Sequence, residues 1–220
     1  MKSVIFLAPP LGGKGTFSDY LIHHCGFTQI STGDLLRSEA EHNEELKAFL
    51  ATGAFVDDET ILQIVEKELS KISLSTPIIL DGIPRTLQQA KKLDIILSGL
   101  KRDVVVIYID VDKKILLDRL LGRRICMKCH RSYNIYIDEF KPKVSMLCDD
   151  CHETLVQRDD DNLESYEVRY AKFLESTMPV VAYYQEKGCL TVLQNNDVDQ
   201  TSALKSLLEV IDDNKKWTWN

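Results

Sequence analysis

The chain has 220 residues, of which 44% are hydrophobic and 28% charged, and its formal net charge at pH 7 is −7. This length and composition predict one soluble globular core with room for one or two small excursions from it. The negative charge argues against a nucleic-acid-binding protein, because such proteins need a broad basic surface, and no apolar stretch is long enough to span a bilayer.

The first predicted element is a strand over Ser3–Leu7, which ends at two prolines and leads into a glycine-rich turn. Phe17, Tyr20, Leu21 and His24 then recur at helical spacing. In such a turn the backbone N–H groups and the helix N-terminus attract phosphate, and a lysine at the helix start reaches the outer phosphates. The residues that would do this here are Gly12, Gly13, Lys14, Gly15 and Thr16.

This turn departs from the usual phosphate-loop pattern at two places. Ala8 stands where a glycine is expected, and Leu11 occupies a second position that often carries one. A leucine with a positive φ angle is strained by about 1 kcal/mol or more. A plain strand-to-helix turn therefore stays open as the alternative interpretation.

Further short apolar runs, typical of buried strands, alternate with segments of helical periodicity along the rest of the chain. The predicted strands cover Pro77–Leu80, Val104–Ile109 and Leu190–Leu193, and the predicted helices Ile61–Leu69, Lys113–Leu121 and Leu163–Gln185. This alternation indicates an α/β fold with a parallel sheet covered by helices on both faces.

Two polar segments lie where strands or helices of this sheet would meet a ligand. The segment 31–37 places hydroxyls, Asp34 and Arg37 around a predicted helix start, where an ordinary N-cap is the alternative. The segment 80–86 places Asp81 at the end of a buried strand and Arg85 beyond a shaped turn. Ligands collect at the carboxyl ends of such strands, although a solvated turn would give the same pattern.

Several arginines lie before and after residues 125–157 in the sequence. Arg119 and Arg123 share a helix face, and Arg158 and Arg169 follow some forty residues later. Guanidinium groups make forked contacts with phosphate oxygens, so their convergence would suit phosphoryl transfer. A stripe of surface ion pairs is the alternative.

Between these arginines lie two Cys-x-x-Cys pairs, formed by Cys126, Cys129, Cys148 and Cys151. This spacing predicts one tetrahedral, structural Zn²⁺ site, with two disulfides or unpaired thiols as the alternative. With four thiols assigned to a metal, only Cys25 and Cys189 are left over, and this cysteine usage fits a reducing compartment. The apolar run at the N-terminus is too short for a signal peptide. We therefore expect a cytoplasmic protein.

Taken together, these motifs resemble adenylate kinase in their order and spacing. The resemblance rests on Gly12–Thr16, Ser31–Arg37, Leu80–Thr86 with Gln89, Asp118–Arg119 with Gly122–Arg124, and Arg158–Asp161. It covers nearly the whole chain, and it is strongest to the bacterial type with a long lid that carries a zinc ribbon. Ala8, Leu11, Phe17 and Ile83 depart from the family pattern.

The resemblance implies a P-loop nucleoside monophosphate kinase fold with a five-stranded parallel core and helices on both faces. Residues 1–30, 62–124 and 162–220 would form the core, 31–61 a small helical AMP-binding arm and 125–161 a zinc-ribbon lid. It further implies reversible transfer of a phosphoryl group from MgATP to AMP, giving two ADP, by a monomer. A kinase for UMP, CMP or GMP, and a non-catalytic nucleotide-binding relative with an altered loop, are the alternatives.

The resemblance also assigns roles to single residues. ATP would contact Gly12, Gly13, Lys14, Gly15, Thr16, Arg119 and Arg123, and AMP would contact Thr32, Arg37, Arg85, Gln89, Arg158 and Arg169. The catalytic group would be Lys14, Arg85, Arg123, Arg158 and Arg169. Asp34 and Asp81 would hold the water shell of Mg²⁺, and the four cysteines would bind Zn²⁺.

Overall fold

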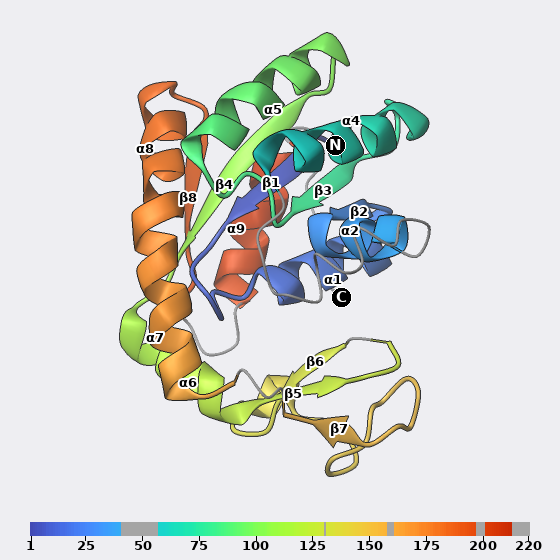
Figure 1. Ribbon diagram of the computed structural model, residues 1–220. Helices are drawn as coiled ribbons and strands as arrows, with labels where there is room; N and C mark the ends of the chain where they lie inside the picture. Colours follow the sequence, from blue (N-terminus) through green and yellow to red (C-terminus); the bar gives the residue numbers. More distant parts are fainter. Residues whose placement is uncertain (41–56, 130, 158–160, 197–200, 213–220) are drawn as a thin grey trace.

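The computed structural model of the chain describes residues 1–40, 57–129, 131–157, 161–196 and 201–212 (Figure 1). The strands are β1 Ser3–Leu7, β2 Thr28–Ser31, β3 Ile78–Asp81, β4 Val104–Asp110, β5 Arg123–Cys126, β6 Ser132–Asn134, β7 Leu155–Val156 and β8 Leu190–Gln194. The helices are α1 Lys14–Cys25, α2 Thr32–Ala40, α4 Asp58–Lys71, α5 Leu87–Gly99, α6 Lys113–Gly122, α7 Leu163–Lys172, α8 Met178–Glu186 and α9 Thr201–Ile211. Arg158 and the C-terminal residues 213–220 lie outside the described residues.

Five strands form a parallel central sheet in the order β2-β3-β1-β4-β8. β1 lies in the middle, where Ile5 pairs with Leu80 of β3 on one side and with Val106 of β4 on the other. Because all five strands run in one direction, their carboxyl ends meet along one edge. The predicted α/β fold with a five-stranded parallel sheet is confirmed.

Helices cover both faces of this sheet, and the alternation of side chains along β1 shows why. Val4 and Phe6 pack into a core with residues of α1, α6 and α9. Ile5 and Leu7 point the other way, into a core with residues of α4, α5 and α8. A central strand that is buried on both faces is expected to be almost entirely apolar, and in β1 every residue after Ser3 is apolar.

The long helix predicted over 163–185 consists of three joined segments. α7 is followed by a π-helical turn, Phe173–Thr177, and then by α8. In this turn the N–H of Met178 bonds to the carbonyl of Phe173, five residues earlier. Pro179 follows and has no N–H of its own, which explains why the regular hydrogen-bond ladder changes at this point.

A second, antiparallel sheet with the order β6-β5-β7 lies apart from the central sheet (Figure 1). A 3-10 turn, Asp138–Phe140, belongs to the same region. Its buried cluster is small and consists of Cys126, Tyr133, Cys148 and Leu155. The sequence predicts a zinc-ribbon lid in this region, which has little apolar core of its own.

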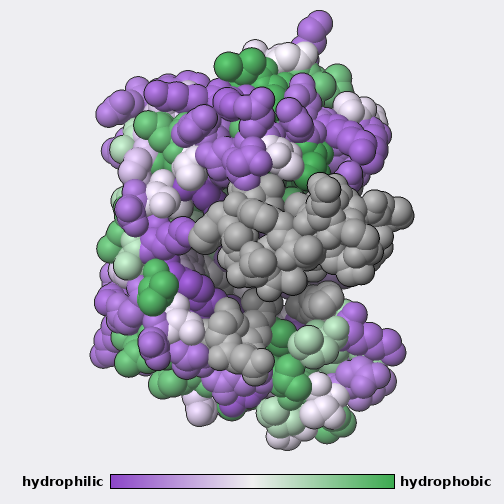
Figure 2. Space-filling model, viewed as in Figure 1, coloured by the Kyte–Doolittle hydropathy of each residue, from purple (hydrophilic) through white to green (hydrophobic). Residues whose placement is uncertain are grey.

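Hydrophilic residues cover most of the described surface in the view of Figure 2, and apolar residues appear there in small groups. In the part of the chain that the structure describes, none of the helices combines the length and apolar character that crossing a membrane requires.

Candidate functional site

The glycine-rich turn between β1 and α1 has two residues in the left-handed backbone region. These are Gly13, with φ 97°, and Leu11, with φ 67°. The N–H of Gly12 closes the turn by donating to the carbonyl of Pro9 at 3.0 Å. Leu11 thus adopts the conformation that costs a leucine about 1 kcal/mol or more, while its side chain packs against the core beneath the turn.

Two buried side chains hold this turn from the outside. Arg119 donates to the carbonyl of Leu11 at 3.4 Å and to that of Asn195 at 3.0 Å. The amide of Asn195 in turn donates to the carbonyl of Gly12 at 2.8 Å. Burial lowers the pKa of Arg119 to about 10, so the guanidinium is still charged at neutral pH. The turn is therefore fixed by groups from α6 and from the segment after β8.

Asp81 at the carboxyl end of β3 is the meeting point of several predicted site residues. One of its carboxylate oxygens accepts a hydrogen bond from the ammonium of Lys14, and the other accepts from the amide of Gln29 at 2.7 Å. The hydroxyl of Thr32 donates to the Asp81 carbonyl at 3.4 Å. Because β1 and β3 are parallel neighbours, the helix that follows one strand begins beside the end of the other.

The turn after β3 brings Thr32 and Arg85 together around Gly82, which has φ 81°. A Cβ atom at Gly82 would lie 2.5 Å from the Thr32 hydroxyl and 3.2 Å from Nη2 of Arg85. No larger residue fits this approach, so glycine is required here for space as well as for backbone conformation. The side chains of Asp34 and Arg37 on α2 lie outside the described residues.

Gln89 lies in the first turn of α5 and is only 4% exposed. Its amide oxygen accepts from the backbone N–H of Arg85 at 2.6 Å, and its amide nitrogen donates to Oδ1 of Asp58 at 2.6 Å. Asp58 belongs to α4, so this contact joins the starts of two helices.

Arg123 and Arg169 converge on one buried carboxylate, that of Asp161. Arg123 makes a forked contact, with Nε at 2.8 Å from Oδ2 and a second bond from Nη2 to Oδ1. Nη2 of Arg169 lies 3.8 Å from the same Oδ1, and the Asp161 side chain has no exposed surface. A buried carboxylate between two guanidinium groups keeps both of them close together and partly neutralised.

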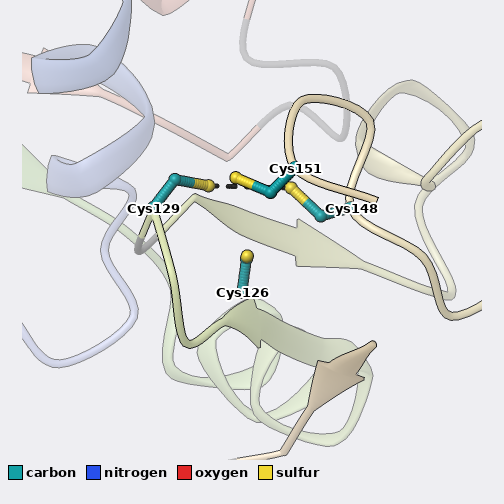
Figure 3. A group of neighbouring side chains, drawn as sticks. All are labelled: Cys126, Cys129, Cys148 and Cys151. Atoms are coloured by element: carbon teal, nitrogen blue, oxygen red, sulfur yellow. Dashed lines mark hydrogen bonds between the residues drawn. The ribbon is translucent and has the colours of Figure 1, made fainter. Parts of the chain in front are cut away.

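The four cysteines of the two Cys-x-x-Cys pairs point toward one another (Figure 3). Their sulfur atoms all lie within 4.8 Å of one another, and Sγ of Cys129 is 3.6 Å from Sγ of Cys148. All four cysteines are free thiols, and no disulfide joins any two of them. Four sulfur ligands at this separation fit a tetrahedral Zn²⁺ with bonds of about 2.3 Å. The predicted ligand set is therefore assembled.

Tyr133 of β6 supports this cluster from beneath. Its hydroxyl lies 3.3 Å from Sγ of Cys148 and accepts the backbone N–H of Asp149 at 2.8 Å, so its own hydrogen is directed to the sulfur. Burial opposes ionisation of Cys148, but the bonds from Tyr133 and from the backbone N–H groups of Cys151 and Asp150 lower its pKa to about 6. These bonds stabilise the thiolate of Cys148, which is the form in which a cysteine binds a metal.

The small sheet is fastened to the core where α6 ends. The amide of Asn134 in β6 donates to the carbonyl of Arg119 at 3.2 Å. A Cβ atom at Gly122 would lie 2.0 Å from Oδ1 of Asn134, so the amide occupies the space that the glycine leaves. The small sheet therefore contacts directly the end of the helix that carries Arg119.

The structure thus brings Lys14, Thr32, Arg85 and Asp81 together at one edge of the sheet, and it gathers Arg123 and Arg169 around Asp161. Sequence reasoning gave no role to three supporting residues, Asp58, Asp161 and Asn195. Asp161 is part of the motif Arg158–Asp161, and nothing in the local sequence distinguishes the other two.

Comparison with known proteins gives a consistent result. The sequence model of the family described as adenylate kinase matches residues 6–189. A protein named adenylate kinase from Thermosipho africanus is 39% identical over 214 residues, which is 95% of this chain and 99% of that protein. Proteins of the same name from Kosmotoga olearia and Citrifermentans bemidjiense are 39% and 41% identical, over 88% and 86% of this chain and 92% and 89% of their own lengths.

Proposed function

Since the chain belongs to the adenylate kinase family and is therefore an ATP-dependent nucleoside monophosphate kinase, we propose that it catalyses the reversible reaction of MgATP with AMP to give two ADP. The observation that carries this proposal is the contact of Lys14 with Asp81 at the carboxyl edge of the sheet, beside Thr32 and Arg85. A phosphate-binding lysine from the start of α1 meets there a carboxylate and an arginine from the end of β3 and the turn that follows it.

The donor nucleotide binds with its phosphates against the backbone of Gly12–Thr16 and the ammonium of Lys14. Arg119 contributes in two ways, by holding the carbonyl of Leu11 and by packing on the donor base. Only 6% of Arg119 is exposed, so base contact requires its neighbours to make room.

Asp81, together with Asp34, holds the hydrated Mg²⁺ that accompanies ATP. The fit rests on the donor atoms, since a carboxylate oxygen at a phosphate site is the ligand type that Mg²⁺ prefers. When bound, the ion neutralises charge on the transferred phosphates.

The acceptor AMP binds on the other side of Asp81, to Thr32, Arg37, Arg85 and Gln89. Arg85 and Arg37 take its phosphate, and Gln89 contacts the base. The phosphate oxygen of AMP is already anionic at neutral pH, so the reaction needs alignment and charge stabilisation rather than a general base.

Arg123, Arg158 and Arg169 surround the phosphoryl group during transfer. Asp161 supports this assignment for the described pair, because it holds Arg123 and Arg169 within reach of one another. Three guanidinium groups stabilise the charge that spreads over the transferred group.

Water competes with AMP for the phosphoryl group, so residues 125–161 act as a lid that closes before transfer. Residues 31–61 act as the AMP-binding arm, and residues 1–30, 62–124 and 162–220 as the core. Zn²⁺ on Cys126, Cys129, Cys148 and Cys151 keeps the lid folded as one unit, since its own apolar cluster is small.

The test is ADP formation by the purified, zinc-loaded protein from MgATP with AMP, UMP, CMP and GMP in parallel. We expect rapid turnover with AMP, and a loss of at least about a hundredfold in Lys14→Met, because the charge on the donor phosphates is then unbalanced. If turnover is faster with UMP, CMP or GMP, that nucleotide takes the place of AMP as the acceptor in the proposed reaction. Nucleotide binding without turnover would refute the proposed reaction and favour a binding protein.

A further inference from the structure

Gln89 has its amide oriented by two groups that leave no choice of direction. The Asp58 carboxylate only accepts hydrogen bonds, and the backbone N–H of Arg85 only donates. The amide nitrogen must therefore face Asp58 and the amide oxygen must face Arg85, each at 2.6 Å. At 4% exposure, water does not compete for these positions.

Asp58 is itself held in place. Its second oxygen accepts from the hydroxyl of Thr86 at 2.8 Å, and the oxygen of that hydroxyl accepts the backbone N–H of Gln89 at 3.1 Å. Thr86, Gln89 and Asp58 thus form a closed ring of hydrogen bonds between the starts of α4 and α5. A rotation of the amide by 180° would set its oxygen against a carboxylate oxygen and its N–H against another N–H.

A primary amide can donate two hydrogen bonds, and its oxygen can accept two. Asp58 and Arg85 use one of each, which leaves one N–H and one lone pair for a ligand. A 6-amino purine offers the complementary pair, an amino donor beside a ring-nitrogen acceptor, and glutamine is a usual bidentate partner of adenine. A 6-oxo purine offers an acceptor in place of that donor, so it would fit only the rotated amide.

We propose that Asp58 is a positioning residue that sets acceptor specificity: by fixing the amide of Gln89 it makes the site accept a 6-amino purine monophosphate and reject a 6-oxo one. This rests on the proposed function, in which Gln89 contacts the acceptor base. Asp58 acts through Gln89 and touches neither the phosphates nor the reacting atoms.

The experiment compares AMP with IMP, which carries an oxygen at position 6 of the purine, in Asp58→Ala, Asp58→Asn and Asp57→Ala. Asp57 is the matched control, because its carboxylate caps the same helix through the N–H groups of Glu59 and Thr60. For each variant the ratio of kcat/KM for AMP to that for IMP is measured, together with Kd for both nucleotides and the thermal unfolding curve.

In Asp58→Ala we expect the AMP-to-IMP ratio to fall at least about fivefold, as the amide becomes free to rotate. The change should lie in KM and Kd, with kcat for AMP nearly unchanged, because base binding is the same in ground and transition states. In Asp58→Asn, whose amide can anchor either orientation of Gln89, the AMP-to-IMP ratio should lie between those of Asp58→Ala and the wild type. Asp57→Ala should lower stability and leave the ratio unchanged.

Asp58→Asn keeps the shape of the site, so it serves as the test if Asp58→Ala does not fold. If the AMP-to-IMP ratio of Asp58→Asn equals that of the wild type, the inference is refuted, even though the protein turns over AMP. A wild type that shows no turnover with AMP would instead refute the proposed function itself. The two failures are therefore distinguishable in one set of assays.

Discussion

Removal of the metal from the cysteine cluster should unfold the region of β5, β6 and β7 and leave the central sheet folded. Apart from the cysteines, Tyr133 and Leu155 are the fully buried apolar residues of this cluster. Burial of two such side chains contributes about 3–6 kcal/mol, whereas a structural Zn²⁺ contributes about 10–16 kcal/mol. Most of the stability of the lid should therefore come from the metal.

Hydrogen exchange followed by mass spectrometry, with and without a chelator, measures this directly. Chelation removes the metal contribution of about 10 kcal/mol or more, which exceeds what the two apolar side chains supply, so amide exchange in peptides of β5–β7 should become at least about a thousandfold faster. Peptides of β1 and β4 should keep their protection. Cys148→Ser should act like the chelator, and Cys189→Ser, which changes an exposed thiol outside the cluster, should not. Unchanged exchange in the lid after verified loss of zinc would refute this reasoning.

Three further predictions concern single side chains. Asp161→Asn should lower kcat about ten- to hundredfold in the ADP assay, because Arg123 loses the full charge of its buried partner. The control is Asp150→Asn, which weakens a surface ion pair with Arg131. An unchanged kcat in Asp161→Asn would contradict the prediction. Arg119→Lys should lower the free energy of unfolding by about 1.5–3 kcal/mol in urea titrations, since one ammonium cannot reach both carbonyls, and equal stability would show that these bonds contribute nothing. Hydrogen bonds from the Thr60 backbone N–H, from the Thr60 hydroxyl and from the Glu59 N–H lower the pKa of Asp57 below 3.8. The ionised cap therefore stabilises the fold above pH 3.8, and this stabilisation is lost as the pH falls through the lowered pKa. Asp57→Asn should remove that part of the acid dependence of the free energy of unfolding, and identical pH profiles of the variant and the wild type would contradict the prediction.

The residues that could be interpreted from sequence are those whose function needs a local pattern. The apolar run of β1, the glycine-rich turn and the spacing of the cysteines each lie within a few positions, so short-range rules apply to them. The positive φ of Leu11 belongs to this group as well, because it follows from the loop position that the leucine occupies.

Residues that act across the fold were not predictable in this way. Arg102 is a clear case, since its buried guanidinium donates to carbonyls of Leu69, Ile72 and Ser73 and so closes the end of α4. The local sequence of Arg102 shows a charged residue in a turn between α5 and β4. Its partner carbonyls lie some thirty positions earlier, and only the packed sheet brings them near.

Asp58 and Asp161 show the same limit at the site. Each is one of several carboxylates in an acidic stretch of the sequence, so residue type alone does not distinguish it from its neighbours. Each carboxylate is distinguished only by its partner in the fold: Asp58 accepts from Gln89, and Asp161 accepts from Arg123. Such pairings depend on the register of helix against strand, which hydrophobic periodicity does not define.

The contact between Asn134 and the end of α6 has a mechanical consequence. Asn134 donates to the backbone carbonyl of Arg119, and the side chain of Arg119 donates to the backbone carbonyl of Leu11 in the glycine-rich turn. A chain of two hydrogen bonds thus links the region that we propose as the lid to the turn that we propose to hold the donor phosphates. A swing of the lid would pull on that turn, and a nucleotide seated in the turn would in return resist or favour the swing, so that occupancy and closure are communicated through one buried arginine.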